Sequence, residues 1–164
     1  MENNTLNFQF VTALNEEESM AIMDLWNQEY PASLSYANLA EFEDYISSLL
    51  APVHILVRKD NHLIGWAVKF YRDNQRWFAI ILSSIVQGRG LGLDLMNKLK
   101  KDEQELNGWV IDNDLGIKQD KKPYRSPLGF YTKNNFALLT DQRLELPTLS
   151  AVKVIWTNKI SYES

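Results

Sequence analysis

The sequence predicts an α+β fold with a central mixed, mostly antiparallel sheet flanked by about four helices. Two patterns predict this fold. Segments of alternating apolar residues, typical of half-buried strands, occur in neighbouring pairs joined by short polar turns. Segments with apolar residues three and four positions apart, typical of helices, lie between them. The chain has 164 residues, of which 45% are hydrophobic, so we expect residues 1–164 to form one domain with a sizeable core.

The N-terminal part predicts a strand and two helices. Residues 5–14 alternate apolar side chains and are expected to form the strand. A helix over 15–28 follows, because Asn15 can cap the free N–H groups and the next three residues are glutamates that oppose the positive helix end. Residues 30–36 interrupt the pattern, and residues 39–49 carry the apolar spacing of a second helix.

Three strands are expected next, over 53–59, 62–72 and 76–83, with turns at Asp60-Asn61 and Asp73-Asn74. An apolar stripe then predicts a helix from Gly90 to Leu106. Ser126 and Pro127 are expected to begin a short helix, since proline at the first helical position loses no hydrogen bond. The remaining expected elements are a strand over 108–112, a loop over 112–125, this short helix over 126–134, and an antiparallel pair of strands over 136–146 and 149–157.

Composition argues against several classes of protein. The formal net charge is -4, whereas a nucleic-acid-binding face is basic. The chain has no cysteine and two histidines; His54 is expected on a strand face and His62 in a solvated turn, so we expect no metal site. The longest apolar run is about six residues, against roughly 18 for a membrane span. The first residues lack a signal-peptide pattern. We therefore expect a cytoplasmic protein with neither a nucleic-acid nor a membrane partner.

The most informative stretch is residues 85–100, with the sequence IVQGRGLGLDLMNKLK. It places three of the chain's seven glycines within five positions, between an apolar strand and a helix. Free N–H groups and the helix dipole make such an N-terminus attractive to a phosphate, and glycines let the phosphate approach. Arg89 could add positive charge. On the glycines alone, a tight turn with a packed helix start is an equally good explanation.

Known motifs narrow this choice. The dinucleotide motif G-x-G-x-x-G fails because Leu93 and Leu95 stand at the third glycine position in its two registers, and the Walker motif lacks Gly-Lys-Ser/Thr. The motif Q/R-x-x-G-x-G/A is present at Gln87, Gly90 and Gly92. This motif binds pyrophosphate in the GNAT acyltransferase superfamily.

A second GNAT motif, A-x-x-x-Y-x-x-x-G-F, is similar to SPLGFYTKNNF at residues 126–136. Pro127 stands at its alanine, Tyr131 at its tyrosine and Phe136 at its phenylalanine. The two motifs follow each other in the order and spacing of that superfamily, among elements in the same order. The sequence therefore resembles a GNAT domain over nearly its whole length.

The resemblance implies an acetyl-CoA-dependent N-acetyltransferase without a metal. Leu82, Ser83 and Ser84 would pair with the pantetheine arm, and the N–H of Leu82 could stabilise the oxyanion. Tyr131 would be the general acid that protonates the departing thiolate. The pyrophosphate would be bound by the segment Gln87, Gly88, Arg89, Gly90, Leu91 and Gly92.

The sequence departs from the GNAT pattern in three places. Asn135 replaces the glycine of the second motif, and asparagine tolerates a positive φ better than most residues. Tyr124 replaces an asparagine seven residues before the tyrosine. No carboxylate lies between Asp73 and Gln87, where many GNAT members carry a glutamate base. Glu29, Asp112, Asp114 or ordered water are then the candidate bases for an amine with a pKa of roughly 10.4.

The acceptor side is less defined. Tyr30, Tyr36 and Asp112 are the candidate acceptor-binding residues. The charged segment KQDKK, residues 118–122, is a solvated loop or an acceptor-side lid. The acceptor would be a small-molecule or peptide amine. The sequence does not decide whether the chain forms a homodimer. A non-catalytic acyl-CoA-binding domain is the alternative function, favoured by the missing strand glutamate and disfavoured by Tyr131. An unrelated nucleotide-binding domain is a weaker third hypothesis.

Overall fold

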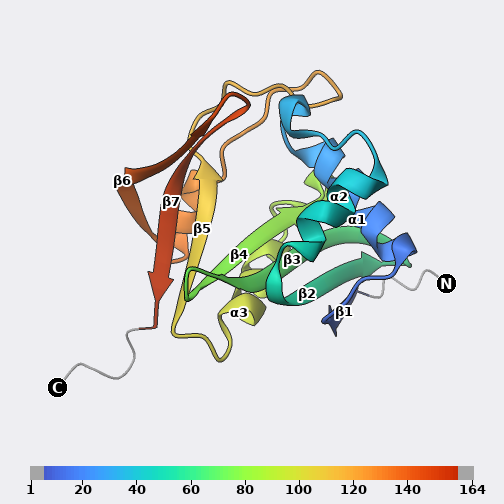
Figure 1. Cartoon of the computed structure of the whole chain (residues 1–164), viewed down its shortest axis with the longest axis horizontal. Helices are drawn as coiled ribbons and strands as arrows, with labels where there is room; N and C mark the ends of the chain where they lie inside the picture. Colours follow the sequence, from blue (N-terminus) through green and yellow to red (C-terminus); the bar gives the residue numbers. More distant parts are fainter. Residues whose placement is uncertain (1–5, 159–164) are drawn as a thin grey trace.

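A sheet of seven strands divides the molecule into two helical layers (Figure 1). The computed structural model describes residues 6–158. The strands are β1 (Leu6–Val11), β2 (Leu50–Lys59), β3 (His62–Arg72), β4 (Gln75–Leu82), β5 (Glu105–Ile111), β6 (Ala137–Leu146) and β7 (Leu149–Thr157). Their order across the sheet is β1-β2-β3-β4-β5-β7-β6. All neighbours are antiparallel except β4 and β5, which are parallel.

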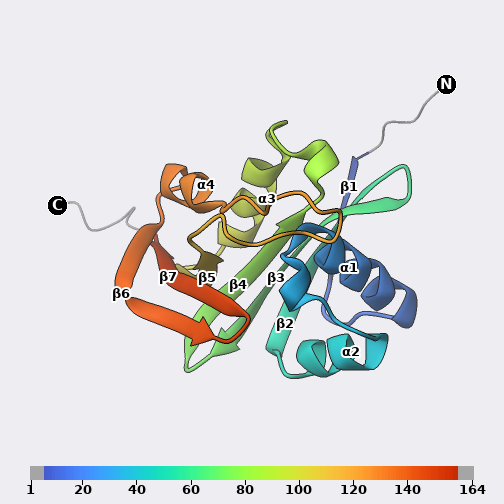
Figure 2. The same cartoon turned by 90° about the horizontal axis from the view of Figure 1, so that it is seen from above.

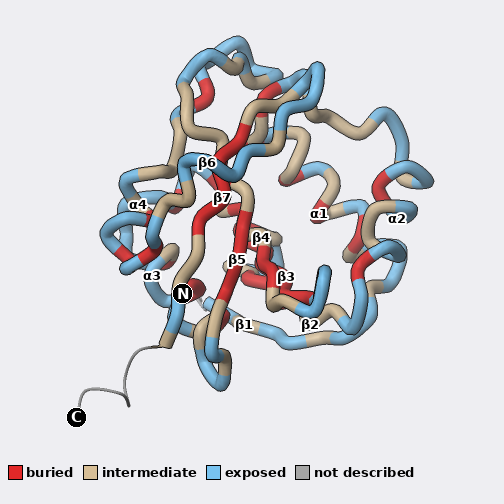
Figure 3. Tube along the Cα trace, turned by 60° about the vertical axis from the view of Figure 1, so that its left-hand side comes forward, coloured by how far each residue is buried: buried red, intermediate tan, exposed pale blue. Residues whose placement is uncertain are grey.

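Two helices cover each face of the sheet (Figure 2). The helices are α1 (Glu16–Glu29) and α2 (Leu39–Ser47) on one face, and α3 (Leu91–Lys100) and α4 (Leu128–Lys133) on the other, with short 3-10 turns at Ala32–Leu34 and Ser84–Val86. Buried residues of α1 and α2 belong to one apolar cluster, and those of α3 and α4 belong to a second. The central strands are buried between these clusters (Figure 3). Within residues 6–158, no helix is long and apolar enough to cross a membrane.

The predicted fold class and order of elements are confirmed. Asn15 begins α1 with a reciprocal cap, in which it accepts the N–H of Glu18 at 2.8 Å while the Glu18 carboxylate accepts the N–H of Asn15 at 2.9 Å. Both predicted hairpin turns place two residues at positive φ. Asn135 has a φ of 68°, so it does take the conformation of the glycine that it replaces.

Several predicted boundaries are wrong. The first strand ends at Val11 rather than at residue 14, and the second begins at Leu50 rather than at residue 53. The helix predicted over 90–106 ends at Lys100, and Leu106 belongs to β5, because the chain turns at Asp102 with a φ of 63°. Leu106 continues the apolar spacing of the helix because its side chain packs in the same apolar cluster as those of α3, although Leu106 belongs to strand β5. The strand predicted to begin at residue 108 therefore begins at Glu105. The helix α4 begins at Leu128 and not at Ser126, with Pro127 as its N-cap residue.

The strands β4 and β5 diverge along their length (Figure 1). Within the described residues they share one paired position, Trp77 with Asn107, near the start of both strands. The Phe78 ring lies directly beyond this position: a Cβ atom on Gly108 would come within 2.7 Å of it. The sheet is therefore open at its centre, between the last residues of β4 and those of β5.

A buried lysine fixes α3 beside this opening. Lys69 of β3 pairs with Glu103 at 2.8 Å and donates to the carbonyls of Leu99 at 3.1 Å and Lys101 at 3.3 Å. Its charge opposes the negative C-terminal end of the helix, and Arg76 shares Glu103 at 3.2 Å. The position of the α3 N-terminus is thus set from the far end of the helix.

We predict a pH dependence of stability from His54. Its side chain is 1% exposed, and its Nδ1 accepts the N–H of Trp66 at 3.1 Å. Burial lowers the pKa of His54 from 6.5 to about 4. The unfolded chain therefore binds this proton more readily, so the free energy of unfolding should fall as pH falls from 6.5 toward 4, by at most about 1.4 kcal/mol per pH unit.

Urea unfolding between pH 7 and 4.5 measures this slope. His54→Gln should flatten it, and the exposed His62→Gln is the matched control that should leave it unchanged. An equal slope in both variants would contradict the assignment to His54.

Candidate active site

The loop between β4 and α3 has a backbone that glycine alone adopts easily. Gly88 and Gly90 have φ values of 81° and 80°, where a side chain is strained. Among the described residues, no atom lies within 4 Å of a Cβ built on either one. Gly90 is the N-cap of α3, and no described side chain caps this helix. The free N–H groups of the first turn therefore face open space, which fits an anion.

The loop is held at one end by the Gln87 side chain and at the other by contact with α4. The Gln87 amide donates to the carbonyl of Leu82 at 2.9 Å, which folds the loop back on β4. Gly92 lies against α4, since a Cβ there would be 3.2 Å from the Phe130 ring. The two sequence motifs are therefore in contact through Gly92 and Phe130.

The end of β4 presents its backbone to the opening. The N–H of Ser83 donates to Ile64 of β3 at 2.8 Å. Because backbone groups alternate in direction along an antiparallel strand, the N–H and C=O of Leu82 point the other way, toward β5. The strand β5 has diverged at this height, so a bound molecule can pair with this edge.

Tyr131 is held on α4 by aromatic packing. It is 6% exposed, and its ring centroid lies 5.3 Å from that of Phe136, 5.4 Å from that of Phe130 and 5.8 Å from that of Phe78. Burial, with a smaller effect from the Tyr124 phenol, raises the pKa of Tyr131. Its hydroxyl therefore stays protonated at neutral pH and can donate a proton. Within residues 6–158 this hydroxyl has no hydrogen-bond partner in the structure.

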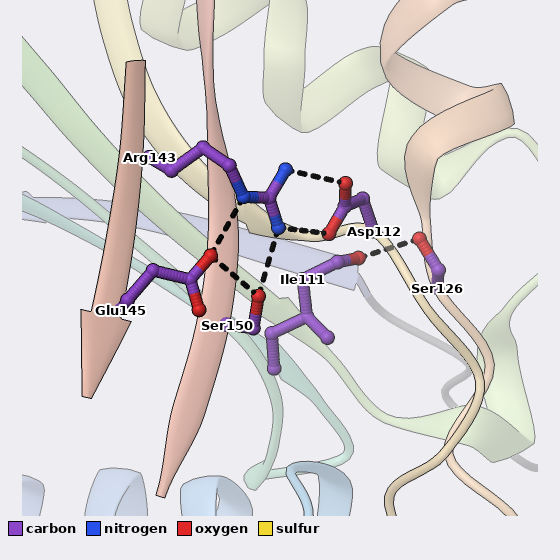
Figure 4. A network of polar contacts seen from close by, with 6 residues as sticks. All are labelled: Ile111, Asp112, Ser126, Arg143, Glu145 and Ser150. Carbon is purple, nitrogen blue, oxygen red and sulfur yellow. Dashed lines mark hydrogen bonds and ion pairs between the residues drawn. The ribbon is translucent and has the colours of Figure 1, made fainter. Parts of the chain in front are cut away.

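A charged network fixes the start of α4 (Figure 4). Arg143 of β6 donates to both oxygens of Asp112, at 2.9 and 3.0 Å, and to Glu145 at 2.7 Å. Next to it, the Ser126 hydroxyl donates to the carbonyl of Ile111 at 2.5 Å. These contacts therefore join the end of β5 to the β6–β7 hairpin on one side and to the segment before α4 on the other.

Hydrogen bonds also affect whether Asp112 and Asp114 can serve as general bases. Hydrogen bonds from Arg143 lower the pKa of Asp112, which makes its carboxylate a weaker base. Asp114 accepts the N–H of Ser126 at 2.6 Å. Asp114 therefore holds the entry to α4, while Asp112 lies with Arg143 rather than with Tyr30 or Tyr36.

Glu29, the last residue of α1, lies against the segment that follows β4. Its side chain is 7% exposed. One oxygen accepts the N–H of Ser84 at 3.0 Å, and the other pairs with Lys118 at 3.3 Å. The structure therefore brings a buried carboxylate from α1 to the open edge of the sheet, where β4 itself has none.

The two candidate acceptor-binding tyrosines have different neighbours. The Tyr30 ring lies 4.6 Å from that of Trp26 and 6.3 Å from that of Tyr124, and burial raises the pKa of Tyr30. Tyr36 also packs on Trp26, at 5.3 Å between ring centroids, and its backbone N–H donates to Asn27 at 2.8 Å. Tyr36 therefore supports the segment between α1 and α2.

No family model matches the chain, and no curated protein matches it in sequence. Solved structures do match. An aminoglycoside 6'-acetyltransferase of type Ii is 14% identical, with a TM-score of 0.68 over 92% of this chain and 96% of its own. A protein from Desulfovibrio desulfuricans assigned to the GNAT acetyltransferases is 10% identical, with a TM-score of 0.66 over 93% of this chain and 99% of its own. The chain has the GNAT fold.

A further GNAT-fold structure is of an aminoglycoside 6'-N-acetyltransferase with coenzyme A bound. It is 14% identical, with a TM-score of 0.65 over 92% of this chain and 96% of its own. In our chain the glycine loop follows β4, and the Tyr131 ring lies 5.8 Å from the Phe78 ring of the same strand.

Two residues of this region, Arg143 and Lys118, carried little or no signal in the sequence. Arg143 lies in an ordinary charged strand, and nothing marks it as the partner of Asp112. Lys118 belongs to a charged run whose other lysines, Lys121 and Lys122, are exposed. Spacing alone does not separate one buried lysine from its exposed neighbours.

Proposed function

We propose that this chain, as one acyltransferase domain, transfers an acetyl group from acetyl-CoA to an amine. The observation that carries the proposal is the opening between β4 and β5, which has the glycine loop at its end and Tyr131 at its side. The similarity to acetyltransferase structures, one of them solved with coenzyme A, supports it.

The open loop suits the pyrophosphate of acetyl-CoA. N–H groups between Gly88 and Gly92 would bind the phosphates, and Arg89, which is exposed, would add charge from the rim. The segment from Leu82 to Ser84 would pair with the pantetheine arm through the backbone of Leu82, which faces β5, because the N–H of Ser83 is taken by Ile64 and that of Ser84 by Glu29. Together these residues would bring the thioester to the end of β4.

The reaction is direct attack of a neutral amine on the thioester carbonyl. The C–N bond forms, the C–S bond breaks, and the thiolate takes one proton. The N–H of Leu82 would stabilise the negative oxygen during attack. Tyr131, whose pKa is raised by burial, would supply the proton to the thiolate, because a phenol that stays protonated at neutral pH is able to do so.

Glu29 is the carboxylate best placed to accept the proton of the attacking amine. It lies two residues beyond the end of β4 through the N–H of Ser84, and its ion-pair partner is the single ammonium of Lys118. Both oxygens of Asp112 are instead bound by Arg143, and Asp114 accepts the N–H of Ser126 further along the chain. We therefore assign the role of general base to Glu29.

Gly90→Val should raise the Kd for CoA by more than tenfold while the protein stays folded, because the branched side chain enters the phosphate space. Calorimetry with CoA measures the Kd. Gly90→Ala is the matched control, since it carries the same positive φ strain with a single added carbon and should bind more tightly than the valine variant. Normal CoA binding by Gly90→Val would contradict the assigned site.

Tyr131→Phe should lower kcat by about 10²–10⁴-fold or somewhat less, because it removes the proton donor and keeps the ring. The Tm and the Kd for CoA should stay nearly unchanged. The release of CoA thiol over a panel of amines measures kcat. A wild-type kcat under chemistry-limited conditions would remove Tyr131 from the mechanism. If wild-type protein binds CoA and acetylates no amine, the non-catalytic acyl-CoA-binding function is favoured instead.

Glu29→Gln should lower kcat by about 10²-fold or more, because the amide accepts the N–H of Ser84 but cannot take a proton. The exposed Asp24→Asn on the same helix is the matched control and should keep wild-type kinetics. If the two variants are equally active, the proton leaves by another route, with ordered water as the remaining candidate.

A further inference from the structure

The ion pair between Lys118 and Glu29 has no role in the proposed acetyl transfer as described so far. The Lys118 Nζ lies 3.3 Å from one Glu29 oxygen, and the two side chains are only 13% and 7% exposed. Such burial is costly for a lysine unless its charge is paired. A primary ammonium therefore occupies the space beside the carboxylate to which we assign the role of base.

A short hairpin in the segment between β5 and α4 brings Lys118 there. Ile117 and Pro123 form an antiparallel bridge, and the carbonyl of Ile117 accepts the N–H of Ala32 at 2.8 Å. Gly116 packs so closely on Pro31 that an added Cβ would lie 2.7 Å from its ring. The loop between β5 and α4 thus crosses over to the end of α1 (Figure 2), and its backbone is anchored independently of the lysine side chain.

The Glu29 carboxylate, which pairs with Lys118, lies near the proposed reaction centre at Leu82. The N–H of Ser84, which Glu29 accepts, follows that of Leu82 by two residues, about 7 Å along an extended chain. An amine that attacks a thioester at Leu82 must approach from this side of β4. The Lys118 ammonium thus lies where an acceptor amine has to be bound and deprotonated.

We propose that Lys118 is an internal stand-in for the acceptor, and that the acceptor is an alkyl primary ammonium whose head group displaces Nζ from Glu29. This inference rests on the proposed acetyl transfer and names the substrate class of the same site. An alkyl ammonium restores both the charge and the N–H donors that leave with Lys118. A hydroxyl compound or an uncharged aromatic amine would leave the buried carboxylate without a counter-charge, which is unfavourable.

The exchange needs no movement of the hairpin backbone. Lysine has a flexible four-carbon stem, and the hairpin keeps its contacts with Ala32 and Pro31 when the side chain turns out. Lys118 therefore competes with the acceptor as a tethered ligand, and its removal should strengthen acceptor binding.

The test is fluorescence anisotropy with a labelled 1,5-diaminopentane that keeps one free amine, at saturating CoA. Lys118→Met removes the ammonium and keeps an apolar stem, and should bind this probe about tenfold more tightly than wild type, since a charged hydrogen bond is lost from the competitor. The exposed Lys121→Met in the same hairpin is the matched control and should bind as wild type does. A probe with a hydroxyl in place of the amine should gain nothing in either variant.

The double variant Lys118→Met with Glu29→Gln should lose the gain, because the carboxylate is the shared partner. Equal probe binding by Lys118→Met and Lys121→Met would overturn the inference, as would weaker binding by Lys118→Met or an equal gain for the hydroxyl probe. The CoA affinity of each variant, measured by calorimetry, verifies that it is folded. Because the probe measures binding without turnover, tight probe binding with no acetyl transfer would count against the proposed function alone.

Discussion

The structure depends on the divergence of β4 and β5 at the centre of the sheet. Backbone N–H and C=O groups in a sheet are normally paired, and leaving them unpaired in the interior is costly. Beyond Trp77 and Asn107 the groups of β4 that face β5 lose their strand partner. A molecule that supplies both donors and acceptors along an extended arm can replace that strand. This is the edge along which we propose that acetyl-CoA binds.

Aromatic packing and charged contacts from distant parts of the chain hold the two sides of the opening. On one side, Lys69 fixes α3 by its C-terminal end, so the glycine loop stays at the end of β4. On the other, Arg143 joins the end of β5 to the β6–β7 hairpin, beside the segment that leads into α4. The Phe78 ring lies between them against Gly108 and near Tyr131. Aromatic packing thus holds Tyr131 in place without a hydrogen bond from its hydroxyl to another described residue.

The roles of the carboxylates follow from their partners and not from their place in the sequence. Asp112 follows β5 directly, which made it a natural candidate, yet Arg143 neutralises it from β6. Glu29 was one candidate among several, and the structure sets it apart because it reaches the β4 edge at Ser84. Lys118 comes to the same carboxylate across 89 residues of chain. In each case a long-range contact decides which carboxylate stays available for an amine.

The sequence by itself determined the order of elements, the caps and turns, and the glycine loop, because these depend on neighbours within a few residues. Asn15, the two hairpin turns and Gly90 are local in this sense. The sequence did not determine where α3 ends, because Leu106, which belongs to β5, follows the same apolar spacing as the helix. The resemblance already implied that the strand before the glycine loop splays from its neighbour, but tertiary structure alone decided that Arg143 pairs with Asp112 and that Lys118 meets Glu29. These features join segments far apart in the chain, and their energies depend on burial and distance, which no local pattern records.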